Sequence, residues 1–220
     1  MSITDRPLRK DAELNRRKIL DAAGELFAER GLCVTLNDVA HHAGVGVGTV
    51  YRRFPDKAQL IDELFEERLA EIHALIEKAI DDPDPWHGLS SFLENALEIQ
   101  ARDRAVKELL FNTPGGAERV AKMRAKMFPL ATVLVARAQE SGQLRPDAAA
   151  QDVPLVQLMI GTIIDLSRDF EPDLWRRCLS IVLQGLRADP GTPEPLEPAP
   201  PAPDRMQAML TAWKPTRDRR

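Results

Sequence analysis

Apolar residues recur at intervals of three and four along most of the chain, which is the spacing of amphipathic helices. Ile19, Ala23, Leu26 and Phe27 form one such stripe within residues 13–30. The alternation of apolar and polar residues that is typical of strands is nearly absent. The pattern therefore predicts an all-α protein of about nine helices.

A short segment after this first helix predicts two brief helices joined by a tight turn. Thr35 and Asp38 have the spacing of a capping box, and Gly44 suits the positive φ of a turn. Ala40 is small enough to let a second helix cross close to it, and Val50 would fill the space between the two helices. These features predict a helix-turn-helix, whose second helix enters the major groove of DNA; a helical hairpin in an ordinary core is the alternative.

Longer helices are predicted in the remainder of the chain. Asp56 is expected to cap one of them, and Asp84 followed by Pro85 is expected to begin the next. The last two helices carry apolar residues on more than one face, which favours burial on two sides. The expected helices are residues 56–80, 85–102, 103–110, 117–141, 148–168 and 172–187.

The end of the chain has a different composition. Seven of the sixteen residues at 189–204 are proline, which favours polyproline II or disorder over a packed core. Beyond them, four apolar residues have the spacing of one amphipathic turn: Met206, Met209, Leu210 and Trp213. We expect either that this tail docks on the rest of the protein or that it remains disordered.

Composition excludes several classes of protein. Hydrophobic residues make up 44% and charged residues 29% of the 220 residues, which are ordinary values for a globular protein. No run approaches the roughly 18 apolar residues of a membrane span, and the first ten residues lack the apolar core of a signal peptide. Cys33 and Cys178 lie far apart without metal-site spacing. A cytoplasmic protein with no membrane partner, no metal and no cofactor is expected.

Charge is distributed unevenly along the chain. The net charge of −4 argues weakly against a nucleic-acid partner, but residues 1–57 hold ten Lys and Arg against eight Asp and Glu. That region is therefore net +2, and the remainder is net −6. The basic residues between Arg6 and Arg17 would enter a minor groove, neutralise phosphates or form a solvated tail.

Residues 16–65 resemble the N-terminal DNA-binding domain of the tetracycline-repressor (TetR) family, including its Tyr-x-x-Phe-x-x-Lys run at Tyr51, Phe54 and Lys57. The resemblance implies an all-helical homodimer that binds a palindromic operator in double-stranded DNA. It also implies a C-terminal domain that binds a small molecule, which releases the protein from DNA. The expected regions are a flexible basic N-terminal arm at 1–12, a helix-turn-helix domain at 13–55, a ligand-binding and dimerisation domain at 56–188, a proline-rich linker at 189–204 and a tail at 205–220.

The resemblance also assigns DNA-binding positions. The phosphate-contacting positions of the family fall on Thr35, Thr49, Tyr51 and Lys57. The base-facing positions fall on Val45, Gly46 and Val47, with Arg52 and Arg53 following. Gly46 departs from the family pattern, in which Ser or Thr is common, and offers no side-chain hydrogen bond. We therefore expect the valines to contact thymine methyl groups and the arginines to contact bases.

Two further surfaces are expected in the C-terminal domain. The effector pocket would be lined by Phe92, Leu93, Ala96, Gln100, Met123, Met127, Phe128, Met159, Thr162 and Ile163. Such pockets are mainly apolar and no cluster of buried charges is evident, so an apolar or aromatic effector is expected; a core role for these residues is the alternative. The dimer interface would use Val156, Ile160, Ile164, Trp175, Leu179, Val182 and Leu186, for which an internal-core role is again the alternative.

The expected function is that of a ligand-responsive transcriptional repressor. The helix that begins near Asp56 would belong to both domains, so a ligand that tilts it changes the spacing of the two recognition helices in a dimer. A non-specific architectural DNA-binding protein is one alternative, and a helical-bundle enzyme is the least favoured one. Catalysis is not expected: adjacent His41 and His42 cannot converge on one metal ion, and the glycines at 44, 46 and 48 follow no strand.

Overall fold

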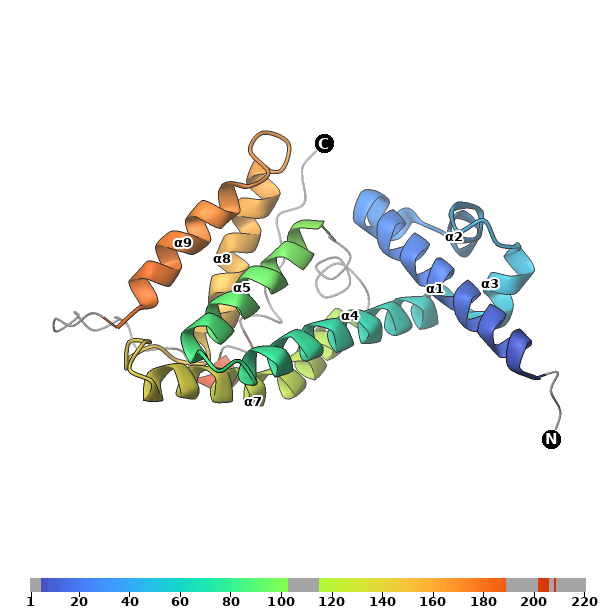
Figure 1. The fold of residues 1–220 in the computed structure, drawn as a ribbon. Helices are drawn as coiled ribbons and strands as arrows, with labels where there is room; N and C mark the ends of the chain where they lie inside the picture. The colour runs from blue at the N-terminus through green and yellow to red at the C-terminus, as the bar shows by residue number, and fades with distance from the viewer. Residues whose placement is uncertain (1–4, 103–114, 189–201, 206–207, 209–220) are drawn as a thin grey trace. The chain divides into compact units, whose positions relative to one another are not determined.

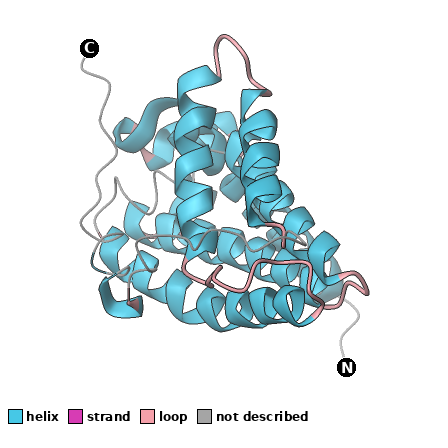
Figure 2. Ribbon diagram, turned by 90° about the vertical axis from the view of Figure 1, so that its left-hand side faces the viewer, coloured by secondary structure: helices cyan, strands magenta, loops and turns pink. Residues whose placement is uncertain are grey.

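The computed structural model describes residues 5–102, 115–188, 202–205 and 208 (Figure 1). Between Asp5 and Leu186 the described residues form eight α-helices and one short 3-10 helix, and the only β-bridge among the described residues joins Leu144 to Arg187. Figure 2 accordingly shows helices connected by loops. The prediction of an all-α fold is confirmed. Among the described helices, none combines the length and the apolar character needed to cross a membrane.

The described residues group into two compact units, and α4 contributes to both. The first unit extends to Arg68 and contains α1 (Asp5–Arg30), the 3-10 helix Gly31–Cys33, α2 (Leu36–His42), α3 (Val47–Arg53) and the first part of α4 (Lys57–Ile80). The second unit starts at Leu69 and contains the rest of α4, α5 (Pro85–Arg102), α7 (Gly116–Glu140) from its second residue on, α8 (Asp152–Ser167) and α9 (Leu174–Leu186). The boundary therefore lies inside α4 rather than at residue 56.

The start of α4 belongs to the first unit because one side of it is apolar. Leu60, Leu64 and Phe65 are buried there, together with the predicted apolar stripe of α1. Ala40 of α2 and Val50 of α3 are fully buried, as the helix-turn-helix pattern predicts. One side of α3 therefore packs into the core of this unit.

α1 begins earlier than the sequence suggested. Residues 5–12, which were expected to form a flexible arm, are its first turns, and residues 1–4 lie outside the description. Pro7 is compatible with this start because N–H groups in the first turn of a helix have no intrahelical partner. Most of the residues from Leu8 to Leu14 are good helix formers, which favours the longer helix.

The second unit has a continuous apolar core. Leu97 of α5, Leu134 of α7, Ile160 of α8 and Trp175 of α9 are all buried in it. α8 packs against both α5 and α9. It begins four residues later than expected, at Asp152, and Pro154 occupies its first turn.

Some predicted features lie outside the described residues. They are the helix expected to end near residue 110, the linker residues 189–201, and the tail residues Met206, Met209, Leu210 and Trp213.

Candidate functional site: the helix-turn-helix and the helical body

α2 is held at both ends by contacts that its sequence specifies. Thr35 adopts an extended conformation, and its hydroxyl oxygen accepts a hydrogen bond from the Asp38 amide at 3.2 Å. In return, the Asp38 carboxylate accepts from the Thr35 amide at 2.8 Å and from the Thr35 hydroxyl at 2.6 Å. These bonds, the hydroxyl first, hold the pKa of Asp38 below its ordinary value. At the other end Gly44 has a φ of 65°, which turns the chain toward α3.

α3 buries one side and exposes the other. Val50 is fully buried, and so is Phe54, which directly follows the helix. Val47 and Tyr51 are each 46% exposed, and Arg52 is exposed beside them. The Arg52 guanidinium donates a hydrogen bond to the Thr49 hydroxyl at 3.2 Å. The exposed side therefore combines an apolar group, a phenol and a guanidinium.

Glycines near the start of α3 are not required by packing. A Cβ added to Gly48 would meet nothing within 4 Å, and one added to Gly46 would meet only the Thr49 hydroxyl at 3.7 Å. Gly46 caps α3 with an ordinary φ of −65° and no side-chain hydrogen bond. Neither position needs glycine for its backbone conformation or for contact with its neighbours. The two glycines therefore leave the backbone at the start of α3 uncovered by side chains.

The other predicted DNA-binding residues have different surroundings. Val45 and Thr49 are half-buried, whereas Thr35 is exposed with its hydroxyl engaged by Asp38. The Lys57 ammonium lies 5.5 Å from the centre of the Phe27 ring, within the range of a cation–π contact. The structure thus gathers the predicted residues of 45–52 around one short helix, and Lys57 follows at the start of α4.

Arg53 has a partner that sequence reasoning missed. Its guanidinium donates to Oε1 of Glu63 in α4 at 2.9 Å, and the Arg16 guanidinium of α1 donates to the same oxygen. Burial disfavours the charged form of Arg16, but the hydrogen bond and the charge of Glu63 outweigh it and raise the pKa of Arg16. These residues lie 10 and 47 positions from Glu63 in the sequence, so no local spacing indicates the cluster.

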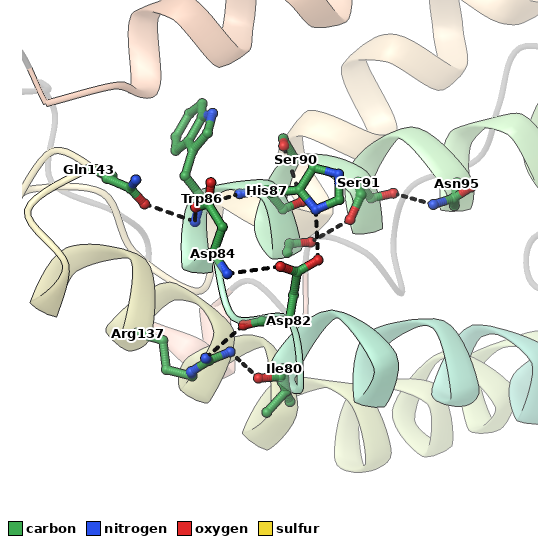
Figure 3. Close-up of polar contacts among 11 residues, drawn as sticks. Ile80, Asp82, Asp84, Trp86, His87, Ser90, Ser91, Asn95, Arg137 and Gln143 are labelled. Atoms are coloured by element: carbon green, nitrogen blue, oxygen red, sulfur yellow. Dashed lines mark hydrogen bonds and ion pairs between the residues drawn. The ribbon is translucent and has the colours of Figure 1, made fainter.

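Within the second unit, polar contacts form a corner where α4 ends and the chain turns to α5 (Figure 3). The Arg137 guanidinium of α7 donates to the backbone carbonyl oxygens of Ile80 and Asp82, the latter at 2.9 Å. Asp84 caps α5 by accepting from the amides of Trp86 and His87 at 3.0 and 3.2 Å. Arg137 therefore satisfies carbonyl groups at the point where α4 ends and the turn to α5 begins.

Two further contacts tighten this corner. Nδ1 of His87 lies 2.6 Å from the Asp82 carboxylate, and this hydrogen bond, followed by one from the Asp84 amide, keeps the pKa of Asp82 below its ordinary value. A Cβ on Gly88 would lie 2.3 Å from the carbonyl oxygen of Ala79, so α5 approaches α4 more closely than any other residue allows. The last turn of α4 consequently has little freedom relative to α5 and α7.

The residues predicted to line an effector pocket fall into three groups. Phe92 and Leu93 are buried in the core of the second unit. Half-buried residues form the second group: Ala96, Gln100, Met123, Met127, Phe128 and Ile163. Met159 and Thr162 form the third group, because both are exposed on α8, and their place in the pocket stays a prediction.

The described residues contain a small apolar recess, but it lies elsewhere. Of its ten lining residues only Leu93 belongs to the predicted set; Leu89, Val135 and Leu144 are typical of the others. Its internal space of about 10 Å³ is close to the minimum for one water molecule. It is therefore too small to serve as an effector pocket in this conformation.

Most of the residues predicted to form a dimer interface are instead core residues of the single chain. This correction applies to Val156, Ile160, Ile164, Trp175 and Leu179, all of which are buried, while Val182 and Leu186 are half-buried against the same core. The apolar residues that α8, α9 and their connection expose are different ones: Met159, Leu166, Phe170, Leu174 and Ile181. The internal-core alternative is thus correct for the five buried residues.

Two family models match separate segments of the chain. Residues 19–64 match the family model of bacterial regulatory proteins of the tetR family. Residues 84–188 match the C-terminal domain of SbtR-like transcriptional regulators. The chain is 28% identical over 208 residues to the HTH-type transcriptional repressor BepR of Brucella suis, a match that covers 86% of this chain and all of that protein.

Solved structures agree in fold. The TetR regulator SCO0520 of Streptomyces coelicolor superposes with a TM-score of 0.63 and 26% identity, covering 79% of this chain and 98% of that one. NalD of Pseudomonas aeruginosa, the secondary repressor of the MexAB-OprM multidrug efflux pump, gives a TM-score of 0.61 and 26% identity, covering 82% and 100%. These relatives are transcriptional regulators and not enzymes. With both segments of the chain matched, the protein belongs to the TetR family of transcriptional regulators and binds DNA through its helix-turn-helix.

Proposed function

We propose that the protein is a ligand-responsive repressor that binds a palindromic operator as a homodimer and is released by a small apolar or aromatic effector. The two-sided character of α3 carries this proposal: Val50 and Phe54 anchor the helix region, while Val47, Tyr51 and Arg52 remain exposed. Apolar, hydroxyl and guanidinium groups on one exposed helix face suit the mixed contacts of a major groove.

The DNA contacts divide into two kinds. Val45, Val47 and Arg52 contact base edges, and the bare backbone at Gly46 permits close approach. Thr35, Thr49, Tyr51 and Lys57 contact phosphates, which position the helix without reading the sequence. Arg53 stands apart because its guanidinium is bonded to Glu63.

A second copy of the chain covers the outer side of α8 and α9. Leu166 and Phe170 are 73% and 84% exposed, and Ile181 is 61% exposed. Large apolar side chains at this exposure favour a protein partner, and a two-fold axis lets one surface pair with itself. Val182 and Leu186 lie at the edge of this surface.

The effector binds among the half-buried residues of α5, α7 and α8. Ala96, Met127, Phe128 and Ile163 are apolar and pack against the core, and methionine side chains adapt readily to different shapes. Gln100 provides one polar group. Its side-chain amide packs against Gly161 of α8, where an added Cβ would lie only 2.3 Å from Nε2 of Gln100. Pockets for small molecules are mainly apolar with few polar groups, which suits this set of residues.

α4 couples the two functions. It is one continuous helix from Lys57 to Ile80 and contributes to both units. Because Arg137 and Gly88 hold its last turn against α7 and α5, a rearrangement of those helices moves α4. The resulting change in the free energy of DNA binding is limited by the difference between the effector's affinities for the two arrangements.

Selection of bound DNA from a random duplex pool tests the proposal. We expect a palindromic consensus whose half-sites lie about one helical turn, or 34–36 Å, apart. Recovery of sequences without a consensus would favour the alternative of a non-specific architectural protein. Such a protein shows little preference for any duplex, whereas a repressor prefers its operator by about three orders of magnitude or more.

A further inference from the structure

A single carboxylate oxygen links three helices of the first unit. Oε1 of Glu63 in α4 accepts hydrogen bonds from Arg53, the last residue of α3, and from Arg16 of α1. The Glu63 side chain is 26% exposed and that of Arg16 is 22% exposed, so this pair is partly shielded from water. Arg53 is more open, with a side chain that is 49% exposed.

The two arginines differ in what else holds them. Arg16 has a second carboxylate, since Nη1 lies 3.3 Å from Oε1 of Glu13. Arg53 has Glu63 as its carboxylate partner and lies 5.6 Å from the centre of the neighbouring Phe54 ring. Loss of the Glu63 charge would therefore leave Arg16 paired and release Arg53.

Arg53 directly follows Arg52 on the short helix that faces DNA. A guanidinium binds a carboxylate and a phosphate through the same N–H groups and with similar geometry. The Nη2 group of Arg53 is bonded to Glu63, whose negative charge offsets part of the charge of this guanidinium. A phosphate therefore competes with this carboxylate for the Arg53 guanidinium, and the ion pair weakens any counterion-releasing contact that Arg53 makes.

We propose that Glu63 is a positioning residue that withholds Arg53 from DNA phosphates and so limits affinity for DNA of arbitrary sequence. This inference rests on the proposed orientation of α3 toward DNA. A sequence-independent contact raises binding to operator and genome alike, and the genome offers far more sites. Keeping one arginine out of the phosphate contacts reduces that competition.

The test compares Glu63→Gln with the wild type on a random duplex over a range of salt concentrations. Each additional phosphate contact steepens the slope of log K against log salt by about 0.9. We expect the full-length variant to show that steeper slope. The ratio of variant affinity to wild-type affinity should then be about eightfold larger at 0.1 M salt than at 1 M salt. The double variant Glu63→Gln/Arg53→Ala should return to the wild-type slope.

Asp21→Asn is the matched control. Asp21 is an exposed residue of α1 that forms no ion pair with any described residue, and its substitution changes the net charge by the same +1. If Glu63→Gln and Asp21→Asn give the same slope, general electrostatics explains the change and the inference is overturned. It is also overturned if the gain persists in the double variant.

Arg53→Ala alone keeps the inference testable even if Glu63→Gln unfolds. Because Arg53 is already engaged, this substitution should leave the slope on random DNA unchanged, and a slope shallower by about 0.9 would contradict that. Failure of this inference can be distinguished from failure of the proposed function. If the wild-type protein has no operator preference, the selection experiment yields no consensus sequence, whatever the variants show.

Discussion

The apolar cores of the two units differ in size and in the helices that they support. In the first unit a small core holds a seven-residue helix, α3, which is too short to be stable alone and leaves one side exposed. In the second unit a larger apolar core joins α5, α7, α8 and α9, and further apolar residues remain on its surface. The first unit thus carries the surface proposed to read DNA, whereas the second unit carries the larger apolar core and the surface proposed to pair with a second copy.

The largest effect is expected in the core of the second unit. Trp175→Ala should lower the free energy of unfolding by about 3–5 kcal/mol, because it removes a fully buried aromatic side chain and leaves a cavity. Urea denaturation followed by circular dichroism measures this change. Gln184→Ala, at an exposed position of the same helix, should change stability by at most about 0.5 kcal/mol. Equal losses for both variants would mean that Trp175 does not anchor the core.

On the outer side of the same unit, assembly rather than folding should respond. Ile181→Glu places a charge on the proposed dimer surface and should weaken self-association about thirtyfold or more, the size of an interface hot spot. Sedimentation over a concentration series measures it. Val133→Glu is the matched control, since Val133 is a similarly exposed apolar residue of α7. Association that is equally sensitive to both substitutions would argue for another interface.

A smaller effect separates stability from DNA binding within α3. Gly48→Ala should raise the free energy of unfolding by about 0.5–1 kcal/mol, because alanine favours the helix and the added methyl group meets no neighbour. Operator affinity should fall nevertheless, since the methyl group stands on the DNA-facing surface. Gly185→Ala in α9 also adds its methyl group to open space and should be similarly stabilised while its DNA binding stays unchanged. Operator affinity that is unaffected by Gly48→Ala would place DNA on another surface.

The smallest effect is a pH dependence at the cap of α2. The pKa of Asp38 is lower in the folded protein than its ordinary value of 3.8, so its contribution to stability is complete above that pH and disappears as pH falls through the lower folded value. The difference in unfolding free energy between wild type and Asp38→Asn should therefore be constant between about pH 5 and 7 and shrink below pH 3.8. A difference that grows on acidification would contradict the capping role.

Local signals explain why the helix boundaries of the first unit could be predicted. A cap and a positive-φ glycine each act over a few residues, as Thr35 and Gly44 do. The start of α1 at Asp5 lies eight residues before the predicted one, because the apolar stripe that predicts the helix begins only at Ile19. The exposure of Val47, Tyr51 and Arg52 agrees with the DNA-contacting positions that the family resemblance assigns to them. Glu63 could not be found in this way, because its bonds to Arg16 and Arg53 depend on how helices pack.

The second unit shows what periodicity leaves undecided. α8 is apolar on two sides, and its sequence alone does not say which side meets the core. In the structure Val156, Ile160 and Ile164 face inward, whereas Met159 and Leu166 face outward. Residues predicted to lie at the interface are therefore in the core, and Met159, predicted to line the pocket, is exposed. The two sides are similarly apolar, so packing against neighbouring helices determines which side is buried.

Operator discrimination by the double variant Val47→Ala/Arg52→Ala tests the central claim most directly. Both side chains lie on the exposed side of α3, where truncation leaves the buried anchors Val50 and Phe54 in place. We expect the ratio of operator affinity to random-duplex affinity to fall at least about tenfold, as expected for the loss of a base contact worth about 1–3 kcal/mol. An unchanged ratio in a fully folded variant would contradict the claim that this side of α3 reads DNA.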